Sequence, residues 1–112
     1  MNIQQMMKQA QKLQAKMQED IAHAQEELGV AQVEGVSGGG LVSVVLNGHK
    51  QLISVRIDKA ALDPEDVQSL EDLVFAALQS ALSGAEAKHE EVMNQVQAGL
   101  NIPGMDIGQF GM

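Results

Sequence analysis

The chain has 112 residues, with seven Lys and Arg, 15 Asp and Glu, no Cys and a formal net charge of −8. This length predicts one domain, and the absence of Cys excludes disulfides, thiol catalysis and a thiolate zinc site. No apolar run approaches the roughly 20 residues of a membrane span, and the start lacks the apolar core of a signal peptide, so the expected location is the cytoplasm, away from membranes.

The first predicted element is an amphipathic helix over about residues 3–28, with Asn2 as its N-cap. Its apolar residues recur at helical spacing and, at about 100° per residue, occupy about a third of the circumference. These residues are Ile3, Met6, Met7, Ala10, Leu13, Met17, Ile21, Ala24 and Leu28. Lys8, Lys12 and Lys16 fall roughly opposite the apolar stripe, so they are expected to face away from the core.

The middle of the chain, about residues 31–58, is the only part whose pattern is typical of a sheet. Three consecutive strands are expected, with turns at Gly38–Gly40 and Gly48–His49, because glycine takes backbone angles that other residues avoid. Period-two alternation predicts one dry face and one face that is at least partly exposed. The residues predicted for the dry face are Val42, Val44, Leu46, Ile53, Val55 and Ile57.

A second helix is predicted over about residues 64–98, with Asp63 as N-cap and Pro64 at the first helical position. It carries a broad apolar stripe, and the pair Ser83–Gly84 favours a break within it. The stripe consists of Val67, Leu70, Leu73, Val74, Ala77, Leu78, Ala81 and Leu82. Residues 99–112 contain four Gly and one Pro without periodicity, which predicts a flexible tail.

The predicted fold is α+β, a single α-β-β-β-α domain over residues 1–98 in which an antiparallel meander lies between two long helices. These helices would be roughly 39 Å and up to about 50 Å long, whereas a compact domain of this size is about 34 Å across. The helices should therefore project, and we expect a homodimer that covers their apolar stripes. The residues expected at the dimer interface are Val55, Ile57, Leu70, Leu73, Val74, Ala77 and Leu78.

No set of residues in the sequence combines a nucleophile, a base and an orienting group, so no catalytic residue and no small-molecule substrate are predicted. Glu86 and His89 have the i, i+3 spacing of di-metal helical bundles, but they lie on a polar stretch without further inward carboxylates. The sequence therefore predicts a protein without enzyme activity, metal or cofactor.

The first helix has an uneven charge distribution. Residues 1–18 contain three Lys and no acid, whereas residues 19–34 contain five acids and no base. Lysines near a helix N-terminus oppose the macrodipole, so they do not serve helix stability. Two interpretations stay open, an ordinary solvated face and a phosphate-binding face. No Arg lies on either helix, so base-specific readout has no candidate residue.

A second function from another class also fits the composition. An acidic interaction module could dock a protein partner on its projecting helices, with Met6, Met7 and Met17 as adaptable contacts. Packing of these Met side chains in the core is the simpler interpretation. The two functions differ in that the module predicts no DNA complex at low or moderate salt.

Three segments in this order resemble the YbaB/EbfC family of nucleoid-associated DNA-binding proteins: MMKQAQKLQAKMQE, EGVSGGGLVSVVLNGHKQLISVRID and LEDLVFAAL. The resemblance covers Met6 to about Leu82. It implies a tweezer-like homodimer that grips duplex DNA with its projecting helices, a place in nucleoid organisation and an influence on gene regulation. The basic first helix of the family maps onto Lys8, Lys12 and Lys16, and Lys88 is the candidate contact from the second helix.

Overall fold

The computed structural model describes residues 2–99. Its elements are α1 (Ile3–Val30), β1 (Val33–Ser37), β2 (Val42–Leu46), β3 (Leu52–Ile57), the short 3-10 helix η1 (Lys59–Ala61) and α2 (Val67–Gly99). This order confirms the predicted α+β class with three strands between two long helices. Of the tail predicted for residues 99–112, Gly99 belongs to α2 and residues 100–112 lie outside the described residues.

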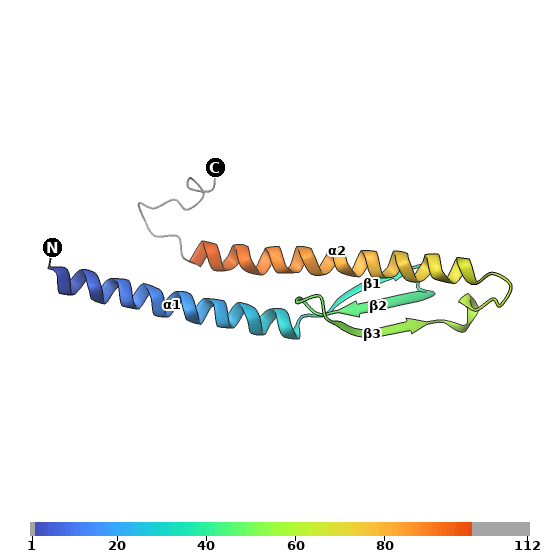
Figure 1. The fold of residues 1–112 in the computed structure, drawn as a ribbon, viewed down its shortest axis with the longest axis horizontal. Helices are drawn as coiled ribbons and strands as arrows, with labels where there is room; N and C mark the ends of the chain where they lie inside the picture. The colour runs from blue at the N-terminus through green and yellow to red at the C-terminus, as the bar shows by residue number, and fades with distance from the viewer. Residues whose placement is uncertain (1, 100–112) are drawn as a thin grey trace, which may run out of the picture.

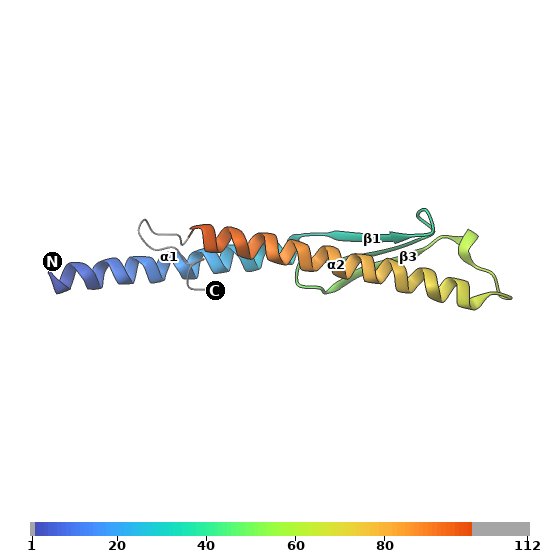
Figure 2. The same cartoon turned by 90° about the horizontal axis from the view of Figure 1, so that it is seen from above.

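The molecule is elongated, with principal extents of 77 × 27 × 16 Å and a radius of gyration of 21.3 Å. A compact domain of this length would have a radius of gyration of about 13 Å. Figures 1 and 2 show the N-terminal half of α1 extending beyond the C-terminal end of α2. The prediction that the helices project is therefore confirmed.

The three strands form an antiparallel meander in the order β1-β2-β3. Gly38, Gly39 and Gly40 all have positive φ, between 60° and 101°, which explains the glycine run between β1 and β2. The pairing of β2 with β3 contains an irregularity at Val45 and Leu46. Turns thus connect the strands at both predicted positions, Gly38–Gly40 and Gly48–His49.

The core lies between α2 and the first two strands (Figure 1). It consists of Val42, Val44 and Leu46 from β2 and Ala77, Ala81 and Ala85 from α2, all of them fully buried. Gly35 of β1 allows the close approach, because a Cβ there would overlap the Ala77 carbonyl and lie 2.9 Å from the Cα of Ala81. Small residues on both surfaces thus bring the helix backbone onto the sheet.

Only part of the sheet face that was predicted to be buried is buried in the single chain. Val55 and Ile57 stand opposite Val44 and Val42 in the register, so they lie on the face that α2 covers. Yet their side chains are 49% and 40% exposed, because α2 packs on β1 and β2 and leaves the edge strand β3 open. The apolar surface of β3 is therefore available to another chain.

Helix α2 begins at Val67, three residues later than predicted. The side chain of Asp66 accepts a hydrogen bond of 3.2 Å from the Ser69 amide, which makes Asp66 the N-cap. Asp63, the predicted cap, instead accepts a hydrogen bond of 3.0 Å from the Glu65 amide in the preceding turn. Asp63 and Asp66 can cap a backbone amide in the same way. In this structure Asp63 stabilises the turn, and Asp66 caps the helix.

The predicted break at Ser83–Gly84 does not occur, since α2 is continuous as far as Gly99. A Cβ on Gly84 would lie 2.5 Å from Cγ1 of Val33. The glycine therefore makes room for a side chain of β1 and does not interrupt the helix. Packing against the sheet stabilises the helix across this position.

Candidate nucleic-acid interface

We call the part of α1 from Ile3 to Ala15 the arm. Asn2 caps its start by accepting a hydrogen bond of 3.0 Å from the Gln4 amide. Every residue of the arm is exposed. Lys16 contacts Gly99, the last residue of α2, so the arm lies beyond the point where α2 ends (Figure 1). The arm is therefore the most accessible helical surface of the described chain.

Lys8 and Lys12 lie one helical turn apart on the arm. Within residues 2–99, neither forms an ion pair. The next acidic residue along the chain is Glu19, nearly two turns beyond Lys12. Two accessible cations in an acid-free segment produce a locally positive surface on a protein whose net charge is negative.

Glutamines extend this basic surface. At about 100° per residue, Gln4, Gln5 and Gln11 lie on the same side of the arm as Lys8 and Lys12. The amide group of Gln donates hydrogen bonds, and Gln side chains are common partners of phosphate oxygens. These residues are missed when charge alone is counted, although the four-residue spacing of Gln4, Lys8 and Lys12 indicates them.

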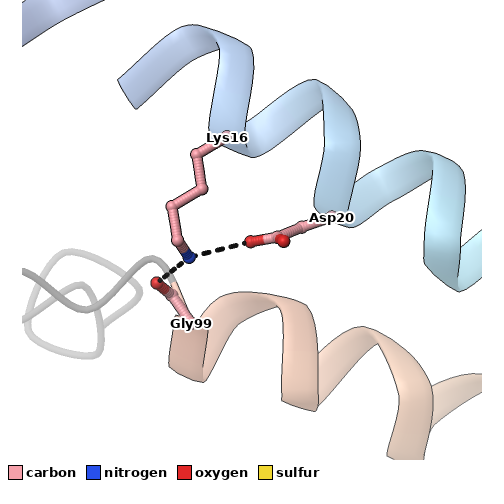
Figure 3. Close-up of polar contacts among 3 residues, drawn as sticks. All are labelled: Lys16, Asp20 and Gly99. Atoms are coloured by element: carbon pink, nitrogen blue, oxygen red, sulfur yellow. Dashed lines mark hydrogen bonds and ion pairs between the residues drawn. The ribbon is translucent and has the colours of Figure 1, made fainter. Parts of the chain in front are cut away.

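Lys16 has a different environment (Figure 3). Its Nζ donates hydrogen bonds of 3.1 Å to Oδ2 of Asp20 and 3.0 Å to the carbonyl oxygen of Gly99. A cation at this point also complements the negative end of the α2 dipole. Lys16 is exposed and faces away from the core like the other two lysines, but unlike Lys8 and Lys12 it joins the two helices.

Lys88 lies apart from the arm, in the packed part of α2. Its spacing from Ala81, Ala85 and Val92 places it on the helix face that is buried in the protomer. The side chain is only 30% exposed, and its Nζ is 3.9 Å from Oε2 of Glu91. The structure does not bring Lys88 together with Lys8 and Lys12.

The remaining cations lie on or near the sheet. Lys50 is 3.6 Å from a carboxylate oxygen of Glu86. Arg56 on β3 and Lys59 on η1 are exposed and form no ion pair within the described part of the chain. Six acids between residues 58 and 72 surround this second pair in the sequence, so it does not produce a positive surface like that of the arm.

The opposite face of the arm is apolar and uncovered. Met6 and Met7 are 51% and 58% exposed, and Met17 is exposed as well. The expectation that these Met side chains pack in the core is therefore not met in the single chain. Only Ala24 and Leu28, near the C-terminal end of α1, are buried, and they pack against Val92 of α2.

Within residues 2–99, no three His, Asp or Glu side chains gather in a way that could hold a metal ion. No helix among these residues is long and apolar enough to cross a membrane.

The described geometry defines a class, an elongated α+β protein with an exposed helical arm that carries lysines and no acid. The same fold occurs in the crystal structure of an uncharacterized protein from Helicobacter pylori, with a TM-score of 0.64 and 27% sequence identity. That alignment covers 90% of this chain and 99% of the Helicobacter chain.

Residues 1–100 match the family model described as the YbaB/EbfC DNA-binding family, and the chain belongs to this family. Among its relatives, a nucleoid-associated protein from Bacillus cytotoxicus is 52% identical over 81 residues, which are 72% of this chain and 74% of the relative. A nucleoid-associated protein from Caldanaerobacter subterraneus is 48% identical over 104 residues, 93% of this chain and 90% of the relative.

Proposed function

We propose that this protein binds duplex DNA as a homodimer, through contacts of its arms with the phosphate backbone, and so takes part in organising a bacterial nucleoid in the cytoplasm. The observation that carries this proposal is the pair Lys8 and Lys12, exposed on the projecting, acid-free arm. Membership of a DNA-binding family and the names of the relatives support it. An influence on gene regulation would follow from occupancy of DNA.

The homodimer is supported by apolar surface that the single chain leaves open. Val55, Ile57 and Leu78 are exposed, and Leu70, Leu73 and Val74 are only partly covered by the core. Ala77 is fully buried within its own chain, so we leave it out of the proposed interface. A symmetric pair of protomers would present two arms to one duplex.

The salt dependence of binding follows from the number of arm lysines that form no ion pair within residues 2–99. Two arms with Lys8 and Lys12 offer four cations, so log affinity should fall with log salt at a slope of about −3.6. Six lysines, with Lys16 included, would give a slope of about −5.4. Because contacts with the phosphate backbone carry no sequence information, affinity should vary little with DNA sequence.

The test is fluorescence anisotropy with a labelled duplex at several salt concentrations. The double variant Lys8→Gln/Lys12→Gln should lose most of its affinity and most of its salt dependence. The double variant Arg56→Gln/Lys59→Gln makes the same change in net charge away from the arm and should bind like the wild type. Wild-type affinity in the arm variant would contradict the proposal, and a wild type without any DNA complex would favour the acidic interaction module.

A further inference from the structure

The C-terminal end of α1 is capped by another part of the chain. The last carbonyls of a helix have no partner within the helix and must find one elsewhere. Here the carbonyl oxygen of Leu28 accepts a hydrogen bond of 2.8 Å from the Gly48 amide. About one turn further into the helix, the carbonyl oxygen of Gln25 lies 3.0 Å from Nε2 of His49, and because a carbonyl only accepts, a hydrogen bond here requires the tautomer with the proton on Nε2. We call residues 47–51, between β2 and β3, the capping turn.

Contact between the capping turn and α1 is close enough to involve both backbones. A Cβ on Gly48 would lie between 2.7 and 2.9 Å from three atoms of Leu28, including its Cα and its carbonyl oxygen. The Leu28 side chain is fully buried. A helix end held at this distance has little room to tilt, since interiors at native packing density contain few voids.

The capping turn also has an internal framework. Asn47 is buried, and its Oδ1 accepts hydrogen bonds of 2.9 Å from the His49 amide and 3.0 Å from the Gln51 amide. Its Nδ2 donates a hydrogen bond of 2.7 Å to Oε1 of Gln51. Lys50 has a φ of 66°, a conformation that non-glycine residues seldom adopt. The side chain of Asn47 thus holds the backbone in the shape that presents Gly48 and His49 to α1.

Helix α1, which carries the arm, would act as a lever about the capping turn, and it is held to α2 as well at Val92 and Gly99. Twenty residues separate Leu28 from Lys8, a distance of about 30 Å along the helix. A tilt of about 10° at Leu28 would therefore move Lys8 by about 5 Å, which exceeds the spacing of about 3.4 Å between successive phosphates of one strand along the duplex axis. Small changes at the capping turn would thus move the lysines out of register with the phosphates.

We propose that the capping turn sets the direction of the arm and that His49 is a positioning residue for binding of the duplex DNA backbone. This proposal rests on the proposed function, because it concerns how well the arms fit DNA. His49 itself need not touch DNA. Loss of its hydrogen bond should leave the same lysines to meet the same phosphates, but only after the arm has been ordered, which lowers affinity without changing the number of contacts.

The direction of the arm can be measured directly. The sequence contains no Cys, so the changes Gln14→Cys and Ser80→Cys would introduce one spin label on α1 and one on α2. Labelled protein diluted with unlabelled protein would report the distance within one chain. We expect a narrow distribution for the wild type, a distribution several Å wider for His49→Ala, and recovery for His49→Gln, whose amide can donate to the Gln25 carbonyl. An unchanged distribution in His49→Ala would overturn the proposal.

The second measurement is DNA binding by unlabelled protein. It uses variants whose far-UV circular dichroism spectrum matches that of the wild type. His49→Ala should bind the duplex about tenfold more weakly at each salt concentration, with the salt slope of the wild type, whereas lysine variants flatten the slope. His49→Gln should restore affinity. A wider distance distribution together with wild-type affinity would overturn the positioning role. If the wild type did not bind DNA, the proposed function and this role would both fall, and the distances would still show whether the turn directs the arm.

Discussion

Lys16 and Gly99 meet across the two long helices, with the Nζ of Lys16 3.0 Å from the carbonyl oxygen of Gly99. The contact joins the base of the arm to the last residue of α2, 83 residues further along the chain. It occupies one of the three lysines of α1 with a contact inside the protein. The three lysines therefore have two different roles. Lys8 and Lys12 remain for a ligand, and Lys16 holds helices together.

Single lysine variants should therefore differ in their effect on DNA binding. Lys8→Gln and Lys12→Gln each remove two phosphate contacts from a dimer and should each reduce the steepness of the salt slope by about 1.8. Lys16→Gln should reduce it by less, because this side chain already has two partners within the chain. Anisotropy titrations at four or five salt concentrations measure these slopes. Equal effects of all three variants would show that Lys16 leaves Gly99 to contact DNA.

The edge strand offers a test of the homodimer. Val55→Asp places a charge on the uncovered apolar face of β3 and should yield a folded monomer, because Val55 is already half exposed in the single chain. Ser54→Asp, at the neighbouring position, adds the same charge on the opposite face and should leave the dimer intact. Light scattering gives the mass of each variant. A Val55→Asp dimer as stable as that of the wild type would place the interface elsewhere.

Because α2 packs closely on β1, adding one methyl group at the contact should have a large effect on stability. Gly35→Ala should destabilise the fold by about 3 kcal/mol or more, because the new Cβ meets the backbone of Ala77 and Ala81, which cannot move aside as a side chain can. Gly39→Ala is the control, since a Cβ there has nothing within 4 Å and costs only about 1–2 kcal/mol through its positive φ. Urea denaturation measures both. A smaller loss for Gly35→Ala than for Gly39→Ala would contradict the packing.

The start of α2 gives a prediction about two aspartates. Asp66→Ala removes the N-cap and should lower the free energy of unfolding by about 1 kcal/mol. Asp63→Ala removes a hydrogen bond in an exposed turn and should cost less, since the helix itself keeps its cap. Thermal or urea denaturation of the two variants makes the comparison. A larger loss for Asp63→Ala would mean that the helix extends back to Pro64.

Much of the fold could be predicted because the sequence patterns that indicate it involve residues close together in the chain. The 3.6-residue period of α1 and the glycines at both turns report backbone preferences that neighbouring residues impose on one another. The predictions failed where two local solutions are nearly equal, as with Asp63 and Asp66, or where a distant partner decides. Gly84 illustrates the second case, because the side chain of Val33 in β1 occupies the space that its missing Cβ leaves.

The same distinction between local sequence patterns and contacts with distant residues applies to the candidate site. The sequence by itself determined the two long helices, the meander between them and the acid-free, lysine-bearing start of α1, since periodicity and charge order are properties of neighbouring residues. Only the tertiary structure decided that Lys16 binds the end of α2, that Lys88 lies on a packed face and that the capping turn holds the C-terminal end of α1. The contacts of Lys16 with Gly99 and of the capping turn with α1 join residues 20 or more positions apart, and the spacing of residues within one helix does not show which distant group will meet them.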